Sequence, residues 1–158
     1  MPYPNAVQSM EPRRAVFGAL FRLSNRLDVA GTHILGELTS KQWFLLAVLT
    51  NLCPSPPTLK DAAQFTGSSY QNVKQIALKL QQKGFLDIVP DPKDRRALRL
   101  VLTERPAQYA HLHMQTQAAF LDRLFQGFTP DDTAALLSLL SRLDGNLDAI
   151  EQERKDSK

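Results

Sequence analysis

Apolar side chains recur along this chain at two different spacings, and these spacings predict most of its secondary structure. Between residues 11 and 38 they fall three or four positions apart, in a stripe interrupted near Gly31, which predicts one long helix or two shorter ones. Residues 40–52 are apolar on almost every side, so we expect a central helix that is covered all round. Prolines in segment 53–57 then predict a loop.

A pair of short helices with a glycine turn between them is predicted next. The first covers residues 59–65, and Gly67 supplies the turn because glycine adopts a left-handed backbone without a Cβ clash. The second covers residues 68–83 with one apolar stripe, and Ser68 and Gln71 have the spacing of a capping box at its start. This pattern predicts a helix-turn-helix, although any helical hairpin with a glycine turn shares it.

An alternating segment follows the second helix and predicts a β-hairpin. Leucines at 98, 100 and 102 alternate with Arg99 and Val101, which is the period of a strand with one buried face. The apolar segment 85–89 is its expected partner, and the charged connection between them is too long for a tight turn. We therefore expect a mostly α-helical fold with a small hairpin, that is, a winged helix-turn-helix.

Two helices are predicted after the hairpin. Residues 106–126 read as helical, and Thr129 followed by Pro130 is a strong signal for the start of another helix. That last helix carries an apolar seam spaced alternately four and three apart: Leu136, Leu140, Leu143, Leu147 and Ile150. The terminal helices carry more leucine than the winged helix can cover, which favours dimerisation over the alternative that they cover their own core.

These patterns predict the organisation of the chain. We expect a flexible tail at residues 1–10 and a polar tail at residues 153–158. Between them lies a helical dimerisation region, residues 11–38 and 106–152, with the winged helix-turn-helix, residues 39–105, inserted in it.

Charge is distributed unevenly over the three parts of the chain. The formal net charge of +3 is the sum of +2 for residues 1–57, +4 for residues 58–105 and −3 for residues 106–158. A basic middle is expected where one central element meets a polyanion. The alternative is that these cations only keep the surface soluble.

Ten residues of the winged helix are candidates for binding double-stranded DNA. Amide, hydroxyl and ammonium groups on the second helix can reach base edges and phosphates, and cations at the wing tip suit a narrow minor groove. The helix candidates are Ser68, Gln71, Asn72, Lys74, Gln75 and Lys79, and the wing candidates are Lys93, Asp94, Arg95 and Arg96. The alternative for the wing is a solvated loop whose charges pair with one another.

The sequence gives little support for a reactive thiol, a metal site or a catalytic site. The single Cys53 has no basic neighbour that would activate it, and two helical residues two positions apart, His111 and His113, cannot chelate one metal ion together. Phosphate-binding glycine loops and serine elbows are missing, so we expect no enzyme, no cofactor and no metal. No apolar segment resembles a signal peptide or a membrane span, so we expect a cytoplasmic protein.

The motifs together carry a family resemblance. The pattern Leu-Thr-x-x-Gln at residues 38–42, the helix-turn-helix, Lys-Gly-Phe-Leu at residues 83–86, and above all Asp-Pro-x-Asp-Arg-Arg at residues 91–96 running into Leu-Thr resemble the MarR (multiple antibiotic resistance regulator) family. Members are homodimeric DNA-binding regulators, usually repressors. Two departures are Ile88, where the family commonly has a basic residue, and Pro106, where a glycine is common nearby.

The resemblance implies roles for several residues. Arg96 resembles the wing arginine that enters the minor groove, and Asp94 its orienting partner. The family places its ligand crevice between the dimer helices and the DNA-binding lobe, where the aromatic residues Phe17, Phe21 and Trp43 would line it, unless they are plain core. The expected function is a homodimeric regulator that binds a pseudo-palindromic operator and is a repressor relieved by a small apolar or phenolic effector. The alternative is a winged-helix protein-interaction module that does not read DNA.

Overall fold

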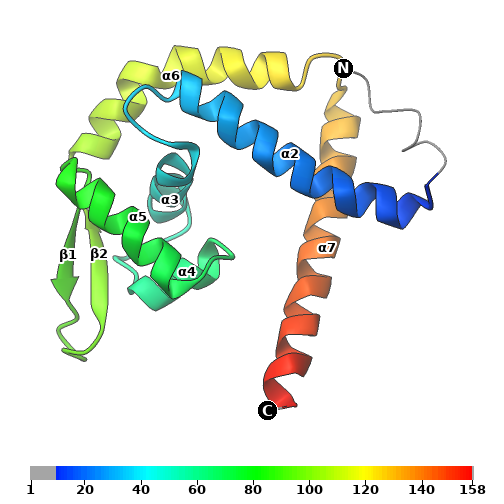
Figure 1. Ribbon diagram of the computed structural model, residues 1–158. Coiled ribbons are helices and arrows are strands. Elements are labelled where there is room, and N and C mark those ends of the chain that lie inside the picture. Colours follow the sequence, from blue (N-terminus) through cyan, green and yellow to red (C-terminus); the bar gives the residue numbers. More distant parts are fainter. Residues whose placement is uncertain (1–9, 158) are drawn as a thin grey trace. The chain divides into compact units, whose positions relative to one another are not determined.

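A computed structural model describes residues 10–157 of the chain, so the predicted tail at residues 1–10 lies outside the described residues except for Met10. The chain divides into two compact units, residues 1–117 and residues 118–158, each described here by itself. In chain order the elements are α2 (Pro12–Ile34), α3 (Ser40–Asn51), α4 (Leu59–Phe65), α5 (Tyr70–Gln82), β1 (Leu86–Pro90), β2 (Leu98–Leu102), α6 (Arg105–Leu124) and α7 (Pro130–Asp156) (Figure 1). The mostly helical winged-helix prediction is confirmed.

Helix α2 is one continuous helix, which decides between the two alternatives for the N-terminal stripe. Gly31 does not interrupt it but allows α3 to approach, because a Cβ at this position would lie 2.5 Å from the Ser40 hydroxyl oxygen. That hydroxyl donates a hydrogen bond of 2.8 Å to the main-chain oxygen of Asp28. The start of α3 is thereby fixed against the end of α2.

Helix α3 begins as predicted but is not covered on all sides. Thr39 and Gln42 form the capping box that the sequence indicated. Helices α2, α4 and α5 contact one side of α3, whereas Trp43 remains 37% exposed and Phe44 47% exposed. The expectation of all-round burial is therefore wrong within a single chain, because nothing in the described residues covers this second face.

The helix-turn-helix has the predicted first helix and a different cap on the second. Helix α4 covers Leu59–Phe65, and Gly67 adopts a φ of 58° in the turn. Helix α5 is capped by Ser69, whose hydroxyl accepts the Asn72 backbone N–H, so the capping role predicted for Ser68 is wrong. The backbone N–H of Ser68 donates to Ala63 O across the turn, and its hydroxyl oxygen accepts from the Asn72 side chain, so Ser68 belongs to the turn before the cap.

The hairpin pairs β1 and β2 antiparallel, with Ile88 opposite Leu100. Leu100 is buried in the core, and its backbone N–H donates 3.0 Å to Pro57 O in the loop before α4. The core is made of fully buried side chains from five of these elements and the segments beside them: Leu38, Leu45, Leu59, Val73, Leu80, Phe85, Leu86 and Leu100. Residues 39–105 thus surround a core of their own, to which the end of α2 and Tyr109 of α6 add side chains.

The terminal helices leave large apolar surfaces exposed. Helix α6 buries only Tyr109 among its residues, and α7, which starts from the predicted Thr129 cap, has an exposed residue at every described position. The helix continues to Asp156, through most of the segment that was expected to be a polar tail. Among residues 10–157, no helix is long and apolar enough to cross a membrane.

Candidate nucleic-acid interface

Helix α5 presents a polar face because its apolar face is held in the core. Val73, Ala77 and Leu80 are buried, and their spacing of four and three places them on one side of the helix. The predicted base-reading residues Gln71, Asn72, Gln75 and Lys79 are exposed, while Ser68 and Lys74 are half-buried. The predicted residues of α5 therefore lie on one accessible face of this helix. Lys74 and Ser68, which precedes the helix, are less accessible.

Ser68 acts on a neighbouring side chain. Its hydroxyl oxygen accepts a 2.8 Å hydrogen bond from the Asn72 side-chain amide. This bond restricts the rotamer of Asn72, and it leaves the amide oxygen of Asn72 available as an acceptor. Ser68 is consequently a residue that orients Asn72 at the start of α5.

The wing tip, residues 91–97, is organised around a buried carboxylate. Asp91 is 4% exposed, and it accepts backbone N–H bonds from Lys93 at 2.6 Å and Asp94 at 3.0 Å and pairs with the Arg99 guanidinium. These backbone hydrogen bonds, with the Arg99 contact, lower the pKa of Asp91 below its ordinary value. Arg99 also donates to Pro56 O, so the same ion pair fastens the wing to the loop before α4.

Asp94 contacts Arg96, the residue that the family resemblance implies it orients, through the Arg96 backbone. Its carboxylate accepts the backbone N–H of Arg96 at 2.9 Å, and no ion pair within residues 10–157 joins it to Arg95 or Arg96. Asp94 shapes the tip backbone and does not pair with an arginine side chain. Lys93, Arg95 and Arg96 are all exposed, and none has a salt-bridge partner in the described part of the chain.

A second set of contacts ties α5 to the loop at residues 35–39. Lys83, at the C-terminal cap of α5, donates to Glu37 O and, at 3.0 Å, to the Gln42 side-chain oxygen. Arg105 at the start of α6 pairs with the Glu37 carboxylate at 3.0 Å. The Tyr109 hydroxyl donates to Leu35 O at 2.7 Å. The loop that joins α2 to the winged helix is thus held by both α5 and α6.

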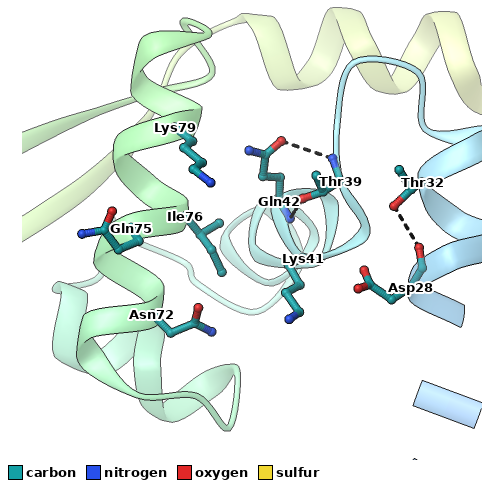
Figure 2. Close-up of a pocket in the computed structure, with 9 residues that line it drawn as sticks. All are labelled: Asp28, Thr32, Thr39, Lys41, Gln42, Asn72, Gln75, Ile76 and Lys79. Carbon is teal, nitrogen blue, oxygen red and sulfur yellow. Dashed lines mark hydrogen bonds between the residues drawn. The ribbon is translucent and has the colours of Figure 1, made fainter. Parts of the chain in front are cut away.

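A polar hollow of about 300 Å³ opens between α2, α3 and α5. Asp28 and Thr32 line it from α2, and α5 contributes a row of residues that includes Lys79 and ends at Asn72. Figure 2 shows Lys41 extending from the start of α3 between Asn72 and Asp28. Sequence patterns gave no sign of this hollow, because it is formed by segments that lie far apart along the chain.

The aromatic residues predicted to line an effector crevice are not part of this hollow. Phe17 is 65% exposed and Phe21 62% exposed, and their rings pack edge to face with centroids 5.1 Å apart. Neither they nor Trp43 line the hollow.

Other reactive groups are few in the described residues. Cys53 is half-buried, and burial, together with Asp61, raises the pKa of its thiol. A higher thiol pKa lowers the population of the nucleophilic thiolate. In residues 10–157, no cluster of three or more His, Cys, Asp or Glu side chains could hold a metal ion.

A helix-turn-helix with a polar outer face, followed by a two-stranded wing with a cationic tip, defines the winged-helix class of proteins. No family model matches the chain. A curated relative, the transcriptional activatory protein BadR of Rhodopseudomonas palustris, is 23% identical over 146 residues, which cover 90% of this chain and 83% of that protein.

Two solved structures show the same fold. The MarR/EmrR family transcriptional regulator from Acinetobacter sp. ADP1 is 19% identical with a TM-score of 0.73, over 89% of this chain and 99% of that one. The organohalide-sensing regulator RdhR-CbdbA1625, in its 2,4-dichlorophenol-bound form, is 16% identical with a TM-score of 0.75, over 92% of this chain and 87% of that one. The chain therefore has the winged-helix fold of these solved regulators, and the names of the three proteins describe transcription regulators rather than enzymes.

Proposed function

We propose that the protein is a homodimeric, sequence-specific regulator of transcription that binds double-stranded DNA. The observation that carries the proposal is the exposed polar face of α5 beside a wing tip whose three cations have no salt-bridge partner within residues 10–157. Amide groups on a protruding helix read base edges in the major groove, and free guanidinium groups suit phosphates and the minor groove. The distribution of charge, +4 over residues 58–105, has the sign that DNA requires.

The alternative, a protein-interaction module, predicts exposed aliphatic side chains on α5. Leu78 is the one exposed aliphatic residue of this helix. A polar surface of this kind fits a polyanion better than it fits an apolar partner surface.

A homodimer would place two copies of α5 on one DNA duplex. The apolar stripes of α2 and α7 supply the surface for such a dimer, because they are exposed in the single chain. Two-fold symmetry then requires a pseudo-palindromic operator with half-sites about one helical turn apart.

Repression relieved by a small phenolic molecule is the regulatory mode that we propose. Support for the ligand class comes from the 2,4-dichlorophenol in the RdhR-CbdbA1625 structure and from the exposed aromatic rings of Phe17, Phe21 and Trp43, which a second copy would cover. BadR is named as an activatory protein, so the sign of regulation needs its own measurement. A reporter gene placed behind the operator measures it directly, since repression predicts higher expression when the protein is removed.

DNA binding is tested by fluorescence anisotropy with the DNA that flanks the gene of this protein. We expect Arg96→Ala to weaken binding to all sequences and to flatten the dependence of affinity on salt, since one cation per subunit is lost. Gln75→Ala should instead relax the preference at particular base pairs, at a cost of about 1–3 kcal/mol for the preferred base.

Arg142→Ala is the matched control, because it removes the same charge from α7, outside the proposed interface. Binding of Arg96→Ala that equals wild type across a salt titration would disprove the role of the wing. Absence of binding to any DNA by the wild-type protein would favour the protein-interaction module.

A further inference from the structure

The polar hollow between α2, α3 and α5 contains two cations whose ammonium groups have no partner among the described residues. Lys41 and Lys79 both line it (Figure 2), and neither makes a hydrogen bond or an ion pair with any residue in the range 10–157. Asp28 is the single carboxylate in the lining. The side chains of the hollow therefore sum to one positive charge.

The start of α3 adds to the positive potential. Lys41 lies in the first turn of this twelve-residue helix, and that turn contains no acidic residue. The partial positive charge of the helix N-terminus is therefore not neutralised locally, and it acts in the same direction as the lysine. This N-terminus lies at the wall of the hollow, where an oxyanion would be attracted by both.

The lining selects among possible anions. Ile76 is the only aliphatic side chain in it, and no aromatic ring lines it. Pockets for drug-sized organic ligands are mostly apolar and aromatic, so a phenolic effector would gain little here. Ammonium and amide N–H groups, such as those of Lys79 and Gln75, suit a small, well-hydrated oxyanion such as a phosphodiester.

The position of the hollow identifies the source of that oxyanion. Asn72, Gln75 and Lys79 belong both to this lining and to the polar face of α5 that we propose reads bases. A helix lying in the major groove has the phosphate backbone along its sides, and contacts to that backbone set the register of the helix. The hollow lies at the side of α5 that faces α3.

We infer that this hollow receives one phosphate of the DNA backbone in each half-site, held between Lys41 and Lys79. The inference rests on the proposed DNA-binding function and adds Lys41, on a helix outside the helix-turn-helix, to the interface. Asp28 opposes the phosphate from the far wall, so this carboxylate limits affinity that does not depend on sequence.

Lys41→Gln tests the inference in the full-length protein by anisotropy across a salt titration. Each lost phosphate contact lowers the slope of log affinity against log salt by about one, so a dimer with two hollows should lose about two. We expect affinity about tenfold weaker near physiological salt for specific and random DNA alike, with Lys41→Arg restoring most of the slope. Asp28→Asn should change affinity in the opposite direction, with tighter binding to both DNAs.

Arg142→Gln, an equal charge change on α7, is the control and should leave the slope at the wild-type value. A wild-type slope and affinity for Lys41→Gln, in a preparation whose wild type binds DNA, would overturn the inference and leave the proposed function intact. A wild type that binds no DNA would instead overturn the proposed function. A third measurement uses benzoate. If benzoate raises the melting temperature of wild type but not of Lys41→Gln, and Lys41→Gln leaves the salt dependence of DNA affinity unchanged, the hollow binds a small carboxylate. This result would also overturn the inference.

Discussion

The winged helix buries its large apolar residues, whereas the terminal helices leave most of theirs exposed. Residues 39–105 bury their leucines in a core made mostly by themselves, whereas α2 buries only Gly31 and α6 only Tyr109. Helix α7 has no buried residue among those described, despite a seam that includes Leu140, Leu143 and Leu147. One region buries its core within a single chain, and the other leaves apolar helix surfaces exposed.

The two regions also differ in net charge. Residues 58–105 carry +4 and residues 106–158 carry −3, so the region with the complete core is suited to a polyanion and the region with exposed leucines is not. A soluble protein rarely leaves a long apolar stripe exposed, because burial of such surface is favourable by about 25 cal/mol per Å². The comparison therefore supports the proposal that residues 39–105 bind DNA and that the terminal helices associate, and mutations in each region test it.

The largest effect is expected where the apolar seam of α7 is charged. The double substitution Leu140→Glu and Leu143→Glu would bury four carboxylates in a two-fold interface, and uncompensated buried charge is strongly unfavourable. We expect a change from dimer to monomer at micromolar concentration, measured by analytical ultracentrifugation, with DNA affinity falling as the second α5 is lost.

Ser138→Glu lies on the opposite face of α7 and is the matched control, since it adds charge without touching the seam. It should remain dimeric. A wild-type protein that sediments as a monomer would contradict the dimer itself, and a double variant that stays dimeric would move the interface away from this seam.

Shortening a leucine should lower stability in different ways in the two regions. Leu80→Ala leaves a cavity in the fully buried core of the winged helix and should cost about 2–5 kcal/mol of unfolding free energy, whatever the protein concentration. Leu147→Ala should lower the melting temperature at concentrations where the wild type is dimeric and leave it nearly unchanged well below the dissociation constant of the dimer, because it weakens association. Calorimetry over a hundredfold range of concentration distinguishes them; equal behaviour of the two variants would remove the distinction between the two regions.

Sequence patterns predicted the features that neighbouring residues determine. The capping box at Thr39 and the bounds of α4 depend on side chains within one turn of each other, so spacing alone identified them. The choice between the adjacent serines at the start of α5 was wrong, because the two have the same side chain and only the structure shows that Ser69 accepts the Asn72 backbone N–H. The Thr58–Asp61 capping box shows the same local signal and passed unnoticed.

Features that depend on distant parts of the chain could not be predicted in this way. Asp91 was recognised as part of a motif, but its pairing with Arg99 and the attachment of Arg99 to Pro56 O needed the three-dimensional arrangement. The contact of Lys83 with Gln42 joins residues 41 positions apart. Composition likewise indicated that α3 is apolar, but only its packing shows that Trp43 lies on the uncovered side.

The wing should lose stability in acid through one carboxylate. Because the pKa of Asp91 is lowered in the folded protein, its contribution is fully present above the ordinary aspartate pKa of about 3.9 and is lost as the pH falls through the lowered value. The difference in unfolding free energy between wild type and Asp91→Asn should therefore be constant above about pH 5 and shrink below pH 4. Urea titrations at pH 7, 5 and 3 measure it, and a constant difference down to pH 3 would contradict this role.

The smallest effect concerns the one buried contact of α6. Tyr109→Phe keeps the ring against Phe85, whose centroid lies 5.6 Å away, and removes only the hydroxyl that donates to Leu35 O. Loss of this hydrogen bond should cost about 1 kcal/mol, since Leu35 O then keeps only the backbone N–H of Leu38 as a donor. Burial, followed by the Glu37 charge, raises the pKa of Tyr109. In wild type the stability from this hydrogen bond is therefore present below the ordinary tyrosine pKa of about 10 and is lost as the pH rises through the raised value.

Urea unfolding at pH 7 should show the loss in Tyr109→Phe and none in Tyr70→Phe, whose hydroxyl has no partner within residues 10–157. Equal midpoints for both variants would mean that the bond from α6 to the loop at residues 35–39 contributes nothing to holding the two regions together.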